Sequence, residues 1–236
     1  MESNIILMVF EGERTEKIIF DNLRNFFLKN NAIVYALYGN VIYEIYEKLR
    51  EDEDDFLDIV PILKEFSQNR TMLEKITRDK ISEIYLFFDH DGHSHIADID
   101  KLEDMLKYFN NETENGKLYI SYPMVEAFKH IGQNIDFNTL TAKIEDNSSY
   151  KKRVNDEADN KFKQINKYTE EIWKEIIFYH VEKLQFITSS QDDYITQYEI
   201  FTNQKKYYIK PNKVVTVLGS FPIFLLDYYG YDICEK

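Results

Sequence analysis

The stretch YLFFDHDGHSH, residues 85–95, places a run of large apolar side chains directly before two aspartates and three histidines. A short continuous apolar run is typical of a strand that is buried on both faces of a parallel sheet. Two other segments have the same character, NIILMVF at 4–10 and AIVYALY at 32–38. Together with KLYISY at 117–122, these segments predict a four-stranded, mainly parallel sheet.

Segments with the helical period lie between these strands, which is the alternation of an α/β fold with helices on both faces of the sheet. Apolar residues recur at helical spacing in 17–29, 40–50 and 98–109, and more helix is expected in an insertion near residues 50–80. Parallel strands need such crossover connections. The first half of the chain therefore predicts an α/β domain that covers residues 1–135.

The pattern changes after residue 135. Residues 136–155 are polar, and residues 159–184 have the apolar spacing of one long helix. No segment rich in Gly, Ser or Pro separates the two halves of the chain, so a flexible linker is not expected. We therefore expect residues 136–236 to form a mainly helical subdomain that packs on the first domain.

Composition favours a cytoplasmic protein with no membrane partner. The 236 residues are 44% hydrophobic and 30% charged, and no apolar run approaches the roughly 18 residues that span a bilayer. The start of the chain lacks the basic segment that opens a signal peptide. A single cysteine, Cys234, excludes a disulfide framework and a cysteine-based metal site.

The formal net charge of −13 bears on the choice of partner. Proteins that bind phosphate backbones are usually basic overall, so this charge argues against a nucleic-acid partner. It does not exclude one, because bound divalent cations neutralise a carboxylate cluster locally and a basic stripe can coexist with acidic faces. The most acidic run, EDEDDFLD at 51–58, is expected to be a solvated loop or the start of a helix.

Acidic residues follow three of the four predicted strands: Glu11 the first, Asp89 and Asp91 the third, and Glu126 the fourth. Binding sites of parallel sheets form at the carboxyl ends of the strands. Residues i and i+2 of an extended segment point the same way, so Asp89 and Asp91 can address one ion. Carboxylates without nearby sulfur suit Mg²⁺ or Mn²⁺.

The segment FEGERTE, residues 10–16, contains two kinds of signal. Thr15 can cap the N-terminus of the following helix, and Glu16 in the first turn complements the helix dipole. Capping accounts for these two residues without any function. It does not account for Glu11 at the end of an apolar strand, or for Gly12, which permits a tight turn or the close approach of a phosphate.

Together these features resemble the TOPRIM domain, in which one strand ends in a catalytic Glu-Gly and a later strand of a parallel sheet ends in Asp-x-Asp. FEGERTEKIIF at 10–20 is most similar to the small TOPRIM nucleases related to the overcoming-lysogenization-defect (OLD) and RloB proteins of bacterial defence systems. Those proteins tend to have a further Glu after the next strand, as in SYPMVEAF at 121–128. The resemblance covers residues 4–130.

The resemblance implies a phosphodiester nuclease that cuts DNA or RNA with Mg²⁺ or Mn²⁺ and serves as an effector of antiphage defence. It implies Glu11, Asp89 and Asp91 as the acidic core of the site, with Glu16 and Glu126 as auxiliary metal ligands. The stretch from Glu11 to Asp89 is long for the family and implies the inserted helices. No ATPase motif is present, so any ATPase partner would be a separate chain.

A lysine often neutralises the charge of the transition state at such sites. Lys129 lies three positions after Glu126, so a helix at this point would put both side chains on one face. Lys117, before the fourth strand, is the alternative catalytic lysine. An ordinary surface role remains open for both.

The histidines support a rival hypothesis. His90, His93 and His95 flank Asp91, which suggests a zinc-dependent hydrolase that uses the 90–95 loop. Zinc sites usually take a further ligand from elsewhere in the chain, but His130 and His180 lie in no recognisable motif. The alternative is that the histidines only line the rim of a site for a harder metal. A second rival is a catalytically silent TOPRIM-like module that binds a partner.

A basic segment near the C-terminus suggests contact with a nucleic-acid substrate. QKKYYIKPNK, residues 204–213, interleaves lysines and tyrosines, which suits a surface that follows a phosphate backbone and stacks bases. The predicted contact residues are Lys205, Lys206, Tyr207, Tyr208 and Lys210. An exposed edge hairpin would explain the same pattern without a function.

Overall fold

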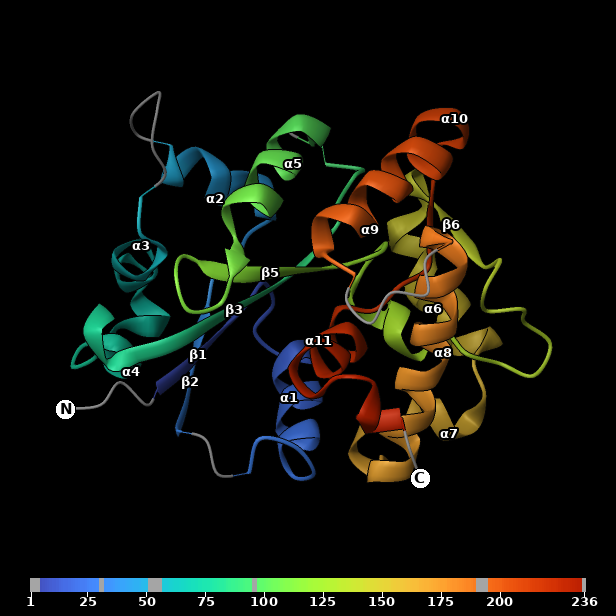
Figure 1. Cartoon of the computed structure of the whole chain (residues 1–236), viewed down its shortest axis with the longest axis horizontal. Coiled ribbons are helices and arrows are strands. Elements are labelled where there is room, and N and C mark those ends of the chain that lie inside the picture. The colour runs from blue at the N-terminus through green and yellow to red at the C-terminus, as the bar shows by residue number, and fades with distance from the viewer. Residues whose placement is uncertain (1–4, 30–31, 51–56, 95–96, 190–194, 235–236) are drawn as a thin grey trace.

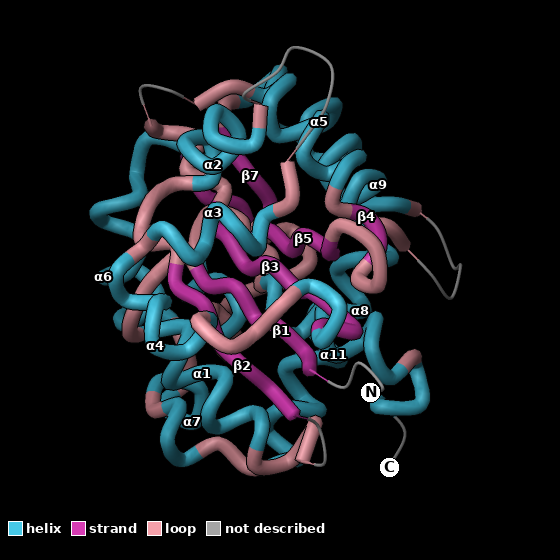
Figure 2. Tube along the Cα trace, turned by 90° about the vertical axis from the view of Figure 1, so that its left-hand side faces the viewer, coloured by secondary structure: helices cyan, strands magenta, loops and turns pink. Residues whose placement is uncertain are grey.

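The computed structural model describes residues 5–29, 32–50, 57–94, 97–189 and 195–234. Its centre is a five-stranded sheet in the order β2-β1-β3-β5-β4 (Figure 2). The strands are β1 (Ile5–Phe10), β2 (Ala32–Leu37), β3 (Ile81–Asp89), β4 (Asn110–Asn111) and β5 (Gly116–Ser121). Strands β2, β1, β3 and β5 are parallel, so the predicted α/β fold with a mainly parallel sheet is confirmed.

The predicted number of strands was wrong by one. The fifth strand, β4, is only two residues long and pairs antiparallel with the start of β5. A segment of two residues is too short to show the alternation by which strands are recognised in a sequence. β4 therefore became visible only through its pairing with β5.

Helices cover both faces of the sheet (Figure 1). Helices α1 (Thr15–Arg24) and α11 (Ser220–Tyr229) lie on one face, and α2 (Ile42–Leu49) and α5 (Ile99–Tyr108) lie on the other (Figures 1 and 2). Between α2 and β3 the described residues form α3 (Ile59–Glu65), η1 (Ser67–Asn69), α4 (Arg70–Leu73) and η2 (Arg78–Lys80).

The short helices between α2 and β3 close one edge of the sheet. The side chain of Asn69 accepts the N–H of Leu37 at 2.8 Å and donates to the carbonyl of Leu37 at 2.7 Å. It thus pairs with the exposed edge of β2 as a neighbouring strand would. This contact satisfies backbone groups that an open edge would leave for another chain.

The C-terminal part is mainly helical. Strands β6 (Thr141–Lys143) and β7 (Val214–Thr216) pair antiparallel in a separate two-stranded sheet. Between them lie the 3₁₀ turn η4 (Ile144–Asp146), α6 (Asn147–Glu157), α7 (Asn160–Lys163), η5 (Ile165–Lys167), α8 (Glu170–Thr188), α9 (Gln197–Asn203), the π-helical turn η6 (Gln204–Ile209) and α10 (Lys210–Asn212). Helix α11 and the 3₁₀ turn η7 (Tyr231–Cys234) follow β7. The single long helix expected at 159–184 is interrupted, because Gln164 leaves the helical conformation and Thr169 caps the start of α8.

The hydrophobic core is continuous across residue 135. Phe221 of α11 stacks on Phe87 of β3 with ring centroids 4.7 Å apart and lies 6.1 Å from Phe10 of β1. Buried residues from both halves of the chain form one cluster. Residue 135 therefore does not separate two cores, because a helix from the end of the chain covers the sheet built by its beginning.

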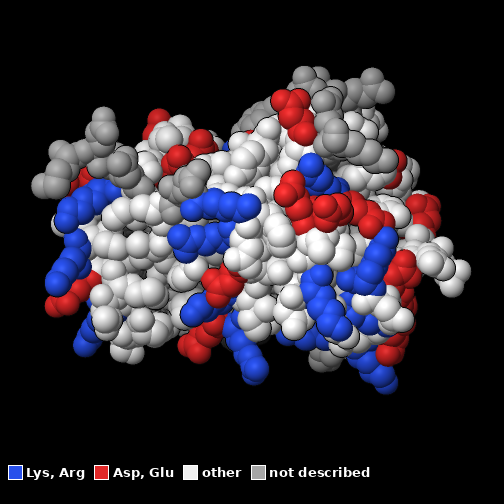
Figure 3. All heavy atoms as spheres, turned by 90° about the horizontal axis from the view of Figure 1, so that it is seen from below, with Lys and Arg blue, Asp and Glu red and all other residues white. Residues whose placement is uncertain are grey.

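Two surface properties bear on partners. Among the described residues, no helix has the length and apolar character needed to cross a membrane. Basic and acidic side chains are interspersed over the face seen in Figure 3. This face therefore presents charges of both signs to a partner, although the chain as a whole has a net charge of −13.

Candidate metal centre

The strand order reverses between β1 and β3, at the middle of the sheet. The chain leaves β1 toward β2 on one side and leaves β3 toward β5 on the other. A switch point of this kind opens a crevice at the carboxyl ends of the strands. Glu11 directly follows β1 and Asp89 ends β3, and Glu11 Oε2 accepts the backbone N–H of Asp89 at 2.9 Å. The structure therefore places these two predicted ligands beside each other in the crevice.

The other predicted carboxylates join this pair. Glu16 lies in the first turn of α1, and its Oε1 accepts the N–H of Gly12 at 3.1 Å. Asp91 shares a hydrogen bond with the carboxyl group of Glu11. The charges of four neighbouring acids raise the pKa of Asp89, so these side chains lie near it: Glu11, Glu16, Asp91 and Glu126. We call these four acids and Asp89 the carboxylate cluster: Glu11, Glu16, Asp89, Asp91 and Glu126.

Burial and mutual repulsion disfavour negative charge in the carboxylate cluster. Burial, with the charge of Asp91 second, raises the pKa of Glu11 from 4.5 to about 9. Burial and then the charge of Glu11 raise the pKa of Asp89 well above its usual range. Burial also raises the pKa values of Glu16 and Asp91. A bound cation reverses this preference, because its positive charge favours the ionised carboxylates.

A buried oxygen of Glu126 lacks the partner that its burial demands. Glu126 Oε1 lies 3.3 Å from Lys151 Nζ, but Glu126 Oε2 is buried and forms no hydrogen bond with the residues that the structure describes. Leaving a buried polar atom unsatisfied costs about 1–3 kcal/mol. Such an atom calls for a physical explanation. A cation ligated by this oxygen would supply one.

The carboxylates do not enclose an ion in their present rotamers. Within the described part of the chain, no group of three or more His, Cys, Asp or Glu side chains is arranged to hold a metal. The oxygens of Glu11 and Glu16 accept backbone N–H groups instead. The backbone sets which groups meet, and terminal carboxylate torsions turn easily, so rotation of these side chains can bring the five acids around an ion. Metal binding would require such rotation.

Asp91 reaches the carboxylate cluster by a route that differs from the predicted one. The extended segment ends at Asp89, and Asp91 has a left-handed backbone with φ 45°. Aspartate tolerates this conformation better than most residues. The premise that residues 89 and 91 point the same way in an extended segment was therefore wrong. The turn, rather than strand alternation, brings Asp91 back toward Glu11.

Gly12 and Thr15 also have roles that differ from those expected. Arg14 occupies the N-cap of α1 without a capping side chain, and Thr15 is the first helical residue. The predicted cap at Thr15 was therefore wrong. A Cβ on Gly12 would lie 2.6 Å from Glu16 Oε2. Glycine at this position is needed so that the carboxylate of Glu16 can fold back over the loop.

Of the histidines that the structure describes, only His93 lies against a member of the carboxylate cluster. His90 is buried, its ring lies 5.4 Å from that of Tyr122, and burial lowers its pKa to about 4. His93 Nδ1 is 3.8 Å from Asp91 Oδ1. His95 lies outside the described residues.

The two remaining histidines are held by the C-terminal part of the core. His130 lies between the Tyr150 hydroxyl at 2.9 Å and Glu157 at 3.0 Å. His180 Nδ1 meets the carbonyl of Ile176 at 2.8 Å. Neither is available to complete a zinc site on the 90–95 loop. The zinc hypothesis therefore rests on the 90–95 loop itself, of which His90 and His93 line one cavity.

Lys129 and Lys117 lie in different places. The 3₁₀ turn η3 (Val125–Lys129) puts Lys129 one turn after Glu126, as predicted. Burial lowers the pKa of Lys129, and the charge of Glu126 opposes this shift. Lys117 stands opposite Tyr85 in the sheet, whereas Asp89 stands opposite Ser121. Four residues of strand, about 13 Å, therefore separate Lys117 from the carboxyl end of β5.

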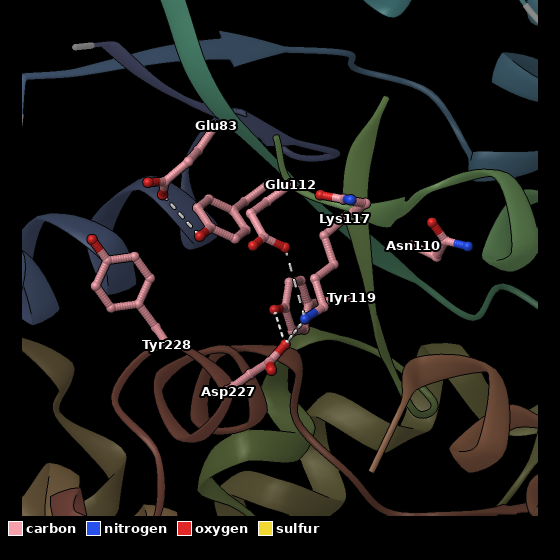
Figure 4. A pocket seen from close by; sticks show the side chains of 9 residues that line it. Glu83, Asn110, Glu112, Lys117, Tyr119, Asp227 and Tyr228 are labelled. Carbon is pink, nitrogen blue, oxygen red and sulfur yellow. Dashed lines mark hydrogen bonds and ion pairs between the residues drawn. The ribbon is translucent and has the colours of Figure 1, made fainter. Parts of the chain in front are cut away.

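Lys117 belongs to a separate polar hollow (Figure 4). Its ammonium is paired with Asp227, which also accepts the hydroxyl of Tyr119, and it lies 3.9 Å from Glu112 (Figure 4). These carboxylates hold the lysine at the far end of the sheet. Lys117 therefore cannot serve the carboxylate cluster, and the alternative catalytic lysine was wrong.

The basic segment at 204–213 is helical, so the expected edge hairpin was wrong. It continues α9 through the π-helical turn η6 into α10. Lys205 pairs with Glu103, and its Nζ lies 3.2 Å from Asp100. These two carboxylates balance the positive charge of Lys205. Tyr207 is exposed, with Lys206 Nζ 4.6 Å from its ring centroid, and Lys210 is exposed. Tyr208 is partly buried.

Lys213, at the end of the same segment, was missed as a candidate, and no local signal distinguished it from the other lysines. It lines a cavity beside the carboxylate cluster together with residues from the N-terminal half.

Comparisons with protein-family models, with curated proteins and with solved structures found no match to this chain.

Proposed function

We propose that the protein is a TOPRIM-like, Mg²⁺- or Mn²⁺-dependent phosphodiester nuclease. The observation that carries this proposal is the meeting of five acidic side chains, from separate elements, in the crevice at the strand-order switch. A buried set of carboxylates without sulfur suits hard divalent cations. The orphaned oxygen of Glu126 supports the same chemistry.

Glu11, Asp89 and Asp91 would hold the metal, with Glu16 and Glu126 as further ligands. Divalent cations bound there would neutralise the scissile phosphate and acidify a water molecule. Lys129 is half-buried on the same 3₁₀ turn as Glu126, so its ammonium can approach a phosphate that enters the crevice. In this partly dry position a positive charge acts more strongly on developing negative charge than it would in water.

The wider role rests on the resemblance of FEGERTE and SYPMVEAF to small TOPRIM proteins of defence systems. We propose an effector of antiphage defence, acting in the cytoplasm on DNA or RNA. The chain has no ATPase motif, so an ATPase sensor would be a separate partner chain. Lys206, Tyr207, Tyr208 and Lys210 remain the predicted contacts to nucleic acid, whereas Lys205 is already paired with acidic side chains of α5.

The test is incubation of the purified protein with single- and double-stranded DNA, tRNA and total RNA in Mg²⁺, Mn²⁺ or Zn²⁺. We expect cleavage in Mg²⁺ or Mn²⁺. Asp89→Asn and Glu11→Gln should each lower the cleavage rate at least about 100-fold, because they remove ligand charge. Both variants should fold, since the neutral amides replace carboxyl groups whose pKa values are raised in the metal-free protein.

His93→Ala tests the zinc alternative, because it changes a histidine beside Asp91 that is not a member of the carboxylate cluster. Its Mn²⁺-dependent cleavage should stay within about tenfold of the wild type, as for a residue that contributes about 1 kcal/mol of positioning. Loss of activity and zinc in this variant, with an active Asp89→Asn, would establish the zinc hydrolase instead. Folded protein that binds no divalent cation would indicate a partner-binding module.

A further inference from the structure

A cavity of about 600 Å³ opens beside the carboxylate cluster. This volume falls in the roughly 300–1,000 Å³ range of sites for small organic ligands. One wall comes from α2, the loop after β3 and the start of α5, and the other from η4, η6 and the residue after α10. The cavity therefore lies between the N-terminal half and the C-terminal half of the chain.

The cavity adjoins the residues that would carry out the reaction. His90, Gly92 and His93, which flank Asp91 in the chain, line it. Tyr43 lines it as well, and its hydroxyl donates to the carbonyl of His90 at 3.0 Å. Burial, and then the charge of Asp91, raise the pKa of Tyr43, which places its ring near the carboxylate cluster. A substrate group in the cavity would thus be held next to the reacting phosphate.

The walls suit a flat heteroaromatic ring. Ile99 and Ile144 are partly exposed and contribute aliphatic surface, whereas Tyr43, His90 and Ile209, which also line the cavity, are buried. The flat face of a nucleobase would lose water by packing on this aliphatic surface, which favours binding. A base inside a duplex is stacked on its neighbours and cannot enter such a cavity unless it leaves the stack.

Charged groups at the cavity favour particular ligands. Lys213 is exposed, and its carbonyl accepts the N–H of Ile144 at 3.2 Å, which anchors its backbone at the rim. Asp98 and Glu145 also line the cavity, and the carboxylate of Asp98 already accepts N–H groups at the start of α5. Glu145 is exposed and can accept hydrogen bonds from an amino group of a base. His93 is the other titratable group at the rim.

We infer that this cavity binds one unpaired nucleotide of the substrate, with its base against Ile99 and Ile144, its phosphate near Lys213, and a base amino group on Glu145. The inference rests on the proposed nuclease function and deepens it. The preferred substrate is accordingly single-stranded, or contains an extruded base, at the site of cleavage. Bases that carry an amino group, such as cytosine, should be preferred over thymine and uracil.

Binding is measured by fluorescence anisotropy with labelled oligo(dC) and oligo(dT), with Ca²⁺ in place of the catalytic metal so that the probes stay intact. We expect the wild type to prefer oligo(dC) about tenfold, the scale of one good contact to a base edge. Glu145→Gln should reduce this preference, because the amide can also donate to thymine. Lys213→Asn, which tolerates the left-handed φ of 55°, should weaken both complexes.

The salt dependence separates a phosphate contact from a merely structural effect. Lys213→Asn should reduce the slope of log K against log salt concentration by about 0.7, the contribution of one phosphate contact on a single strand. Lys167→Asn is the matched control, because Lys167 is an exposed lysine of η5 that does not line the cavity. The control should leave the affinity, the slope and the base preference unchanged.

The outcomes distinguish this inference from the nuclease proposal. If Asp89→Asn abolishes cleavage while Glu145→Gln and Lys213→Asn bind both oligonucleotides like the wild type, the nucleotide cavity is wrong and the nuclease stands. If the oligonucleotides bind as expected but no nucleic acid is cut in any metal, the cavity stands and the nuclease is wrong. Absence of both binding and cleavage would overturn both.

Discussion

At the scale of single residues, Gly12 determines where a carboxylate lies. A side chain at this position would occupy the space of the Glu16 carboxylate, with its Cβ 2.6 Å from Oε2. The displaced group is the flexible end of a long side chain, so the backbone need not move. Gly12 therefore affects the metal centre through the position of Glu16 rather than through the stability of the fold.

Gly12→Ala should separate metal binding from folding. We expect the free energy of unfolding to change by less than about 1 kcal/mol, as for an ordinary loop substitution. The affinity for Mn²⁺, measured by calorimetry, should fall about tenfold or more, the usual cost of disturbing the groups that orient a metal ligand. Glu16→Gln should have the same effect on affinity, and Glu13→Gln, at an exposed neighbour, should have none. Unchanged affinity in Gly12→Ala would remove Glu16 from the ligand set.

At the scale of elements, α11 supports the strands that carry the site. Its Phe221 stacks on Phe87 of β3 and lies near Phe10 of β1, and these two strands lead into Asp89 and Glu11. Phe221 is fully buried. A helix that is remote in the sequence thus fixes the separation of the two strand ends from which the carboxylate cluster is built.

Phe221→Ala should be strongly destabilising. Truncation of a buried phenylalanine costs about 3–5 kcal/mol, because apolar area is lost and a cavity remains. The measurement is urea-induced unfolding. The control is Phe186→Ala on α8, where the side chain is 51% exposed and the change should stay within about 0.5 kcal/mol. Equal effects of the two substitutions would show that α11 does not contribute to the core of the sheet.

At the scale of the whole molecule, a buried lysine ties α8 to the loop that follows the first half of the chain. Lys183 is fully buried, and its Nζ donates to the carbonyls of Phe137 at 2.6 Å and Leu140 at 2.7 Å. Burial lowers its pKa from 10.5 to about 7, while the charge of Asp136 opposes the shift. The ring of Phe137 and the side chain of His180 pack in the same region.

This lysine makes stability depend on pH. Because its pKa is lower in the folded protein, the unfolded chain binds more protons between pH 7 and 10.5, and stability should rise with pH across that window. The stability that the neutral Lys183 contributes at high pH is lost progressively as pH falls, and it is gone below about pH 7, where Lys183 is protonated in the folded protein as well. One group can contribute at most about 1.4 kcal/mol per pH unit.

The measurement compares unfolding free energies of the wild type and Lys183→Met from pH 7 to 10. The difference between the two proteins isolates Lys183, because both contain Glu11, whose raised pKa makes stability fall with rising pH. We expect the wild type to gain stability relative to the variant as pH rises. A difference that is independent of pH would mean that Lys183 stays protonated in the folded protein.

Local patterns were enough to predict the main parts of the fold and most members of the carboxylate cluster, whereas Glu16 was assigned only from the family resemblance. The apolar runs that became β1, β2, β3 and β5 are short enough to read directly from the chain, and parallel strands bring their carboxyl ends to one edge. Glu11, Asp89 and Glu126 could therefore be assigned to one crevice before their distances were known. Position relative to the strand ends, rather than the identity of any one acid, made this inference work.

Tertiary structure decided the features that depend on contacts between remote segments. The return of α11 to the sheet and the pairing of Lys117 with Asp227 both depend on partners far away in the sequence. The same is true of the cavity that Lys213 lines with the loop after β3. Periodicity records which face of an element is buried, but it carries no information about which element buries that face.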